Sequence, residues 1–64
     1  MTETDIKLEI VQRYQNGEET PQIADYVLGI DEVQSVNADS SVRMTVVLVN
    51  RVSFVVDLEY VERS

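Results

Sequence analysis

Cysteine, histidine and tryptophan are all missing from the 64-residue sequence, and lysine occurs only once, at Lys7. The absence of cysteine excludes a disulfide framework. Without cysteine and histidine, neither a zinc finger nor a nucleophile that depends on a histidine base can form. The sequence also lacks a glycine-rich phosphate loop, a G-x-S-x-G motif, an H-E-x-x-H motif and the spacing of an EF-hand. We therefore expect no enzymatic activity, no catalytic residue, no cofactor and no metal site.

Positive charge is scarce, with 5 Lys and Arg against 12 Asp and Glu, which gives a formal net charge of −7. Because the nucleic-acid backbone selects for Lys and Arg, we do not expect direct nucleic-acid binding from this composition. Repulsion among the carboxylates opposes a compact monomer when salt does not screen it. Two interpretations remain open: the solvated acidic surface of a salt-adapted protein, and an acidic face that binds a basic partner.

Long apolar runs are absent as well, since none approaches the roughly 18 residues of a membrane-spanning helix. Acidic residues, including Glu3 and Asp5, stand where a secretory signal carries positive charge, so we expect a cytoplasmic protein without membrane association. The length fits one small domain over residues 1–64. A chain of this size without disulfide or metal gains little margin of stability from its core, so we expect a homodimer.

The N-terminal half has the spacing of two helices. The pattern predicts a helix over residues 5–16 with Thr4 as its N-cap, and a shorter helix from an N-cap at Thr20 to a stop at Gly29. Apolar residues recur three and four positions apart in both segments. They are Ile6, Ile10, Val11 and Tyr14 in the first segment, and Ile23, Ala24, Val27 and Leu28 in the second.

Residues 42–61 have the alternation of a β-hairpin, in which the even-numbered positions are apolar from Val42 to Leu48 and again from Val52 to Tyr60. The two apolar sets share a face only if the loop has an odd number of residues. A three-residue loop over 49–51 meets this condition, and it also places Arg43 opposite Asp57 on the outer face as a favourable ion pair.

Residues 31–38 fit either a helix or a strand. We favour a strand, because a two-stranded hairpin alone is marginal in water and a third strand completes a meander. The predicted fold is therefore α+β, with two N-terminal helices packed on a three-stranded antiparallel meander.

One resemblance covers residues 6–36. The series Ile10-Val11, Tyr14, Gly17, Thr20-Pro21-Gln22-Ile23-Ala24, Leu28-Gly29-Ile30, Val33 and Val36 resembles a helix-turn-helix domain of the transposase or winged-helix kind. The resemblance implies a small dimeric transcriptional regulator, with the hairpin as its wing. The position of the recognition helix, residues 31–39, carries three acids and no Lys or Arg, whereas groove reading needs donors.

The acidic residues form the first candidate site. Along one strand, Asp57 and Glu59 point the same way about 6.7 Å apart, a spacing of charge that imitates a phosphate track. We predict that both bind a partner, with Arg43 positioning the strand and with Glu18 and Glu19 contributing at the corner between the helices. In composition the chain is similar to small acidic inhibitors of nucleic-acid-binding proteins, including phage anti-restriction and anti-CRISPR proteins.

The outer face of the hairpin forms the second candidate site, because apolar or β-branched residues stand there instead of charged ones. These residues are Thr45, Val47, Val49 and Val55, and we predict that they form a dimer or sheet contact. The alternative is that valine is present only as a good strand former. Three functions follow in order of preference: an inhibitor or modulator of a basic nucleic-acid-binding protein, a dimeric regulator, and a structural or assembly subunit.

Overall fold

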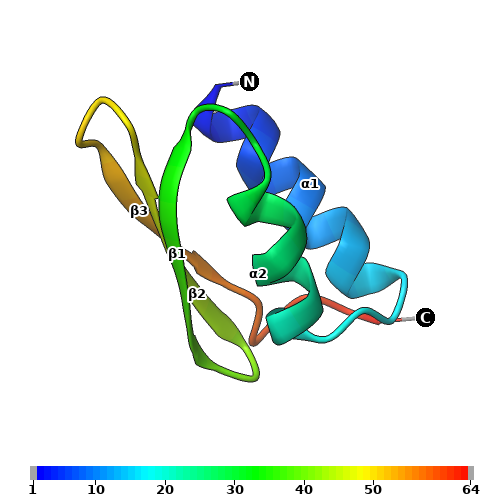
Figure 1. Ribbon diagram of the computed structural model, residues 1–64. Coiled ribbons are helices and arrows are strands. Elements are labelled where there is room, and N and C mark those ends of the chain that lie inside the picture. The colour runs from blue at the N-terminus through cyan, green and yellow to red at the C-terminus, as the bar shows by residue number, and fades with distance from the viewer. Residues whose placement is uncertain (1, 64) are drawn as a thin grey trace.

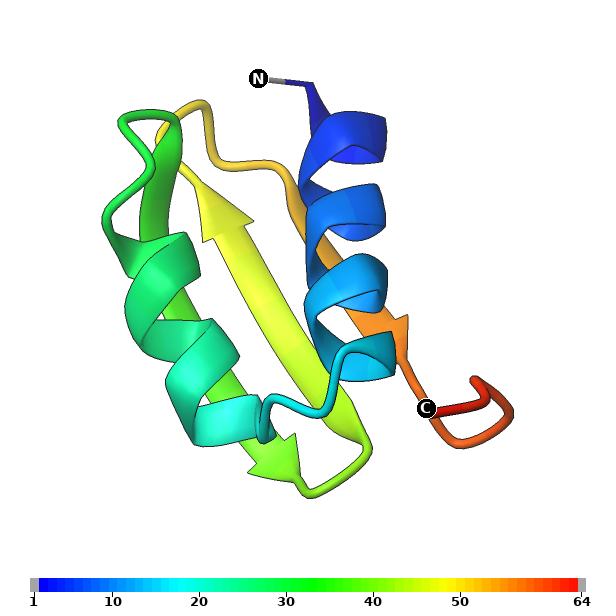
Figure 2. The same ribbon diagram turned by 90° about the vertical axis from the view of Figure 1, so that its right-hand side faces the viewer.

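The computed structural model describes residues 2–63, as two helices followed by a three-stranded antiparallel sheet of order β1-β2-β3. The elements are α1 (Glu3–Gln15), α2 (Thr20–Leu28), β1 (Val33–Ser40), β2 (Arg43–Leu48) and β3 (Ser53–Asp57). Both helices lie on the same face of the sheet, as Figures 1 and 2 show, with α2 over β1 and α1 over β3. The predicted α+β architecture is confirmed.

Helix α1 begins earlier than predicted, because its N-cap is Thr2 and not Thr4. The Asp5 backbone N–H donates to the Thr2 hydroxyl oxygen over 3.2 Å, and the Thr2 backbone N–H donates to the Asp5 carboxylate over 3.1 Å. This reciprocal capping box needs an acceptor three residues after the cap. A cap at Thr4 would place Lys7 there, and an ammonium group cannot accept a hydrogen bond.

Helix α2 begins at Thr20, and its N-cap is Glu19, so the prediction of Thr20 as the N-cap is wrong. The Glu19 backbone N–H donates to the Gln22 side chain over 3.1 Å. The Thr20 side chain is buried instead, and its hydroxyl donates to the Ser40 carbonyl over 3.1 Å. The Thr20 hydroxyl therefore forms a long-range hydrogen bond at the end of β1 and does not form the helix cap that the sequence predicts.

The register of the hairpin is confirmed. Met44 pairs with Val56, Val46 with Phe54, and Arg43 with Asp57. The Leu48 N–H donates to the Val52 carbonyl over 2.8 Å and closes the three-residue loop. Within that loop Arg51 adopts a left-handed conformation, with φ at 73°.

Strand β3 ends at Asp57, so the prediction of a hairpin extending to residue 61 is wrong at its end. After Leu58, whose N–H still donates to the Val42 carbonyl, the Glu59 N–H donates to the Asp57 side chain over 3.0 Å and the chain turns away. Asp side chains commonly bind the backbone two residues on in this way. Tyr60, expected on the buried face, is consequently 90% exposed.

Arg63 ties the final segment back to the helices. Its Nε donates to the Tyr14 carbonyl over 3.2 Å, and its guanidinium lies 4.6 Å from the centre of the Tyr14 ring. Its Nη2 also pairs with Glu19 at 3.3 Å. One arginine thus joins the C-terminal segment to the end of α1 and to the corner before α2.

The segment that fitted either a helix or a strand is strand β1, which pairs with β2 along its length. Its register shifts between Val33 and Ser35 and again between Ala38 and Ser40, so β1 carries an extra residue at Gln34 and at Asp39. Such bulges twist an edge strand and make it a poorer template for pairing with another chain.

The core lies between the helices and the inner face of the sheet. The helices contribute Ile6, Ile10, Tyr14, Ile23 and Val27, and the sheet and its flanks contribute Val33, Met44, Val46, Leu48, Phe54, Val56 and Leu58. The sheet members from β2 onward are all even-numbered, as the alternation of the sequence predicts. The odd-numbered side chains of β2 and β3 therefore point away from the helices.

We expect Thr20→Val to lower the free energy of unfolding by about 1 kcal/mol, because it removes a hydrogen bond at a buried position while keeping the shape of the side chain. Urea unfolding followed by circular dichroism measures this change. Thr20→Ser is the matched control, since it keeps the hydroxyl. An equal loss in both variants would show that the methyl group, and not the bond to Ser40, stabilises this contact.

Because of the capping box, we expect the free energy of unfolding to depend on pH. Hydrogen bonds from the backbone N–H and the hydroxyl of Thr2 lower the pKa of Asp5 below its ordinary value. The stabilisation that this carboxylate contributes is therefore present above about pH 4 and is lost as the pH falls through the lowered pKa of the folded state. We expect the difference in unfolding free energy between wild type and Asp5→Asn to shrink on acidification.

Urea titrations at several pH values between about 6 and about 2 measure that difference. Asp25→Asn on α2 is the control, because it removes the same charge outside any cap. A difference that shrinks equally for both variants would assign the effect to overall charge instead of to the cap.

Candidate partner-binding surface

The face of the sheet opposite the helices is uncovered, and we call it the outer sheet face. Figure 1 shows that no helix lies on this side. Three rows cross it, in register between neighbouring strands: Ser35–Val47–Ser53, Asn37–Thr45–Val55, and the pair Arg43–Asp57. Small polar side chains thus surround a short apolar centre, and a charged row lies at one end.

The apolar centre is smaller than the sequence suggested. Thr45 and Val47 are half-buried on the middle strand, and Val55 is 53% exposed on the edge strand. Val49 lies beyond β2, in the loop to β3, and so does not share the outer sheet face with the other residues predicted to form this contact. The strand ends at Leu48, and the Val49 N–H donates to the Glu32 carbonyl over 2.9 Å. The contact residues that the structure brings together are therefore Thr45, Val47 and Val55.

The charged end combines one arginine with two carboxylates. Arg43 Nη2 lies 3.7 Å from Asp57 Oδ2, as the predicted register requires. The Asp39 carboxylate accepts hydrogen bonds from the Thr45 hydroxyl and from the Asn37 amide, over 2.5 Å and 2.6 Å. Sequence reasoning did not select Asp39 as a site residue, because no pattern of alternation predicts the bulge that places it beside Thr45.

Asp57 and Glu59 do not lie along one strand as predicted. Asp57 is the last residue of β3, and Glu59 follows in the turn that the Asp57 side chain caps. The spacing expected for alternate residues of a strand therefore does not apply to this pair. Both carboxylates remain at the same end of the molecule, where Asp57 belongs to the outer sheet face and Glu59 to the turn beside it.

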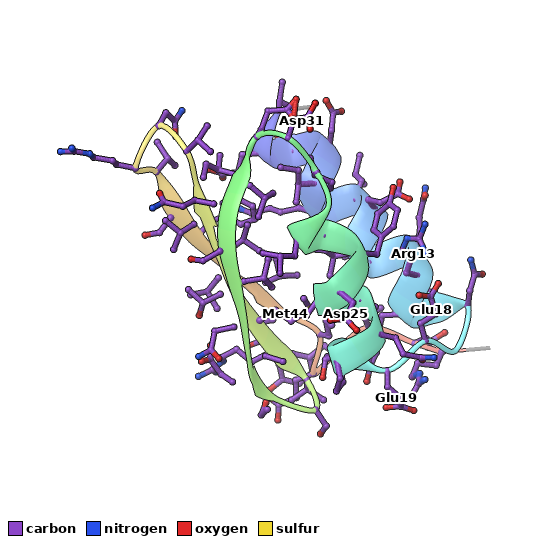
Figure 3. All side chains as sticks on the ribbon, viewed as in Figure 1. Arg13, Glu18, Glu19, Asp25, Asp31 and Met44 are labelled. Carbon is purple, nitrogen blue, oxygen red and sulfur yellow. The ribbon has the colours of Figure 1, made fainter. Side chains whose placement is uncertain are left out.

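Glu18 and Glu19 lie at the corner between the helices, on the side away from the outer sheet face (Figure 3). Glu18 pairs with Arg13 at 3.1 Å, and Glu19 pairs with Arg63 at 3.3 Å. Arg13 also stacks on Tyr26, with 3.4 Å between the guanidinium carbon and the ring centre. These two carboxylates thus hold the chain's own arginines and do not extend the surface around Asp57.

Most of the cations are used within the chain. Lys7, Arg13, Arg43 and Arg63 each contact a carboxylate, whereas Arg51 contacts none within residues 2–63. Several carboxylates in the same residues have no cation beside them: Asp25, Asp31, Asp39, Glu59 and Glu62. The excess of negative charge therefore lies on the surface without a counter-charge from the protein itself.

Within residues 2–63, no group of three or more Asp or Glu side chains is arranged to hold a metal ion. None of the helices in that part of the chain has the length and apolar character needed to cross a membrane.

Comparison of the chain with protein-family models, with curated proteins and with solved structures finds no match. The position that a recognition helix would occupy in a helix-turn-helix domain, residues 31–39, forms a turn at 31–32 and then most of β1. An assignment of function therefore depends on the surfaces of this chain alone.

We expect the double variant Asp57→Asn, Glu59→Gln to change the free energy of unfolding by less than about 1 kcal/mol, because exposed ion pairs contribute little. The Arg43 and Asp57 side chains are 55% and 45% exposed. Urea unfolding measures the change, with Ile10→Ala as a comparison that should cost about 2–5 kcal/mol from the core. A loss as large as that of Ile10→Ala would show that the charged end has a structural role.

Proposed function

We propose that the protein is a non-enzymatic interaction module that binds a basic nucleic-acid-binding protein through its outer sheet face. The observation that carries this proposal is the composition of that uncovered face. Two carboxylates, Asp39 and Asp57, stand at one end with a single arginine, next to the exposed Val55.

Charge supports a basic partner. The chain has a net charge of −7, and four of its five cations are engaged by its own carboxylates. A surface of one sign accelerates the encounter with a partner of opposite sign and disfavours partners of like sign. A protein that normally binds phosphates presents a positive surface, and carboxylates compete with phosphates for the arginines and lysines of that surface.

The centre of the face supports a protein over a small ligand. Val47 and Val55 supply apolar surface between polar neighbours, and Ser35, Asn37 and Ser53 supply hydrogen-bonding groups around them. An apolar centre within a polar rim is the usual composition of a protein interface. Small molecules, in contrast, bind in concave pockets.

A structural or assembly subunit is the second candidate, and the same observation favours it. Val47 and Val55 on an uncovered sheet are also a surface for a second copy of the chain, which would account for the expected homodimer. A dimeric regulator ranks below both, because residues 33–39 belong to a strand, so that this proposal has to place DNA reading on another element.

The test is capture of partners from an extract of the source cells by the tagged protein, with nuclease present and mass spectrometry as the readout. We expect recovery of a basic nucleic-acid-binding protein that added double-stranded DNA displaces. The variant Asp57→Asn, Glu59→Gln should weaken its binding and flatten the dependence of affinity on salt, because fewer charges are then neutralised on binding.

The control variant Glu9→Gln, Asp25→Asn removes the same charge from the helical side and should bind as wild type does. Equal binding by all three proteins at low salt would contradict the assignment to this face. Recovery of the chain alone, with self-association that Val47→Lys abolishes, would support the assembly subunit instead.

A further inference from the structure

Strand β3 forms one edge of the sheet, and no further strand lies beyond it within residues 2–63. Figures 1 and 2 show β3 at the side of the sheet that α1 covers. The opposite edge, β1, carries two bulges, whereas the pairing of β3 with β2 has no register shift. The strand Ser53–Asp57 also contains neither Lys nor Pro, two residues that commonly protect an edge from pairing. The β3 edge is therefore a regular template for another strand.

The backbone groups of β3 alternate in direction. The Leu48 N–H donates to the Val52 carbonyl, and in steps of two from this pair the even-numbered residues of β3 bond to β2. The residues between them direct their N–H and C=O groups to the other side. Ser53, Val55 and Asp57 therefore present backbone donors and acceptors at the free edge.

We propose that the β3 edge pairs with the β3 edge of a second copy of this chain. The two strands run antiparallel about a two-fold axis, the commonest symmetry of homodimers. Val55 lies opposite Val55 of the second copy, and Ser53 lies opposite Asp57, so that the outward N–H and C=O groups of these residues bond to one another. Both members of each opposite pair are odd-numbered, so the two outer sheet faces lie on the same side and form one continuous surface.

The side chains that become neighbours in this register are compatible. Val55, which is 53% exposed in the single chain, packs against Val55 of the second copy on the outer sheet face. The Ser53 hydroxyl lies opposite the Asp57 carboxylate and donates to it. On the inner face, Phe54 lies opposite Val56, so an apolar pair extends the core across the two-fold axis.

Charge favours an antiparallel second copy as the occupant of this edge. Arg51 is exposed in the loop before β3 and contacts no carboxylate within residues 2–63. Glu59 follows the other end of β3 and has no cation beside it within the same residues. Antiparallel pairing brings Arg51 of each copy towards Glu59 of the other, whereas parallel pairing would bring like charges together.

The helices add a second contact. Because α1 lies over β3, pairing of the edges places the two α1 helices side by side. Lys7 Nζ lies 5.3 Å from the centre of the Phe54 ring, which shows the side of α1 that faces β3. Val11 lies one turn further along that side and is half-buried, and Leu8 beside it is 54% exposed. The second copy covers this apolar surface, which a monomer leaves in water.

The test measures self-association of the unmodified protein. At an ionic strength of about 0.15 M the Debye length is about 8 Å, which screens the repulsion between two copies of net charge −7. One strand edge and one helix side form a small interface, so we expect sedimentation to show a monomer–dimer equilibrium with a dissociation constant on the order of 0.1 mM.

NMR locates the interface. The amide hydrogens of Ser53, Val55 and Asp57 should exchange about fourfold more slowly at ~1 mM than at ~10 µM protein, in proportion to the fraction of monomer. In a mixture of labelled and unlabelled protein, we expect an intermolecular NOE between the Hα atoms of Phe54 and Val56, which form a non-hydrogen-bonded pair in this register.

The variant Val55→Pro removes one N–H from the free edge and none from the bonds to β2, a position where an edge strand tolerates proline. It should weaken the dimer by at least about tenfold, which corresponds to the loss of central hydrogen bonds. Val55→Thr is the matched control, since it keeps the N–H and the branched side chain, and it should dimerise within about threefold of wild type.

A charge exchange tests the same register without changing the strand. Arg51→Glu should weaken the dimer, because it places like charges next to each other across the two-fold axis. The double variant Arg51→Glu, Glu59→Arg has the net charge of the wild type and should restore dimerisation. This comparison decides the matter even if Val55→Pro fails to fold.

A protein that stays monomeric at ~1 mM would overturn the inference. So would a dimer that Val47→Lys abolishes while Val55→Pro leaves it intact, since Val47 lies on the middle strand and its loss would assign self-association to packing of the outer sheet faces. The inference does not rest on the proposed function. If the edge does not pair, a single copy still presents the outer sheet face to a basic partner; if the edge pairs but no such partner is captured, only the proposed function is wrong.

Discussion

Burial of one face of the sheet beneath two helices is the constraint on which the rest of the structure depends. Side chains alternate between the faces of a strand, so this burial requires the apolar residues of paired strands to lie on the same side. Met44, Val46, Phe54 and Val56 meet the requirement only in the register that a three-residue loop provides. Arg51 adopts a left-handed backbone conformation in that loop, which is unfavourable for a residue other than glycine. Burial of the apolar inner face, which this register allows, offsets that unfavourable local free energy.

The same constraint creates the candidate binding surface. Two helices are enough to cover one side of a three-stranded sheet, and nothing in residues 2–63 covers the other side. Val47 and Val55 are left there among serine, threonine and asparagine, and the predicted register brings Arg43 and Asp57 into one row. The chemistry of the outer sheet face is therefore a consequence of how the inner face packs.

Two of the few cationic side chains, Arg13 and Arg63, join separate segments of the chain near the ends of the helices. Arg13 stacks on Tyr26 and meets two glutamates, which links α1 to α2 across the corner. Arg63 binds the carbonyl of Tyr14 and the side chain of Glu19, which holds the C-terminal segment against the helices. Because these arginines are used internally, the surface keeps a net negative field that favours a basic partner.

The sequence by itself determined the two helices, the hairpin register and the side of the sheet that is buried. Each of these depends on the short-range spacing of apolar residues or on whether the hairpin loop has an odd number of residues. The sequence also determined the excess of negative charge. Only the tertiary structure decided which of the acidic side chains gather. The bulge at Asp39, the early end of β3 at Asp57 and the buried hydroxyl of Thr20 each depend on contacts between segments far apart in the chain. Local sequence patterns carry no information on such contacts, so they do not indicate the place of Asp39, they extend the strand past Asp57 to Glu59, and they predict Tyr60 on the buried face.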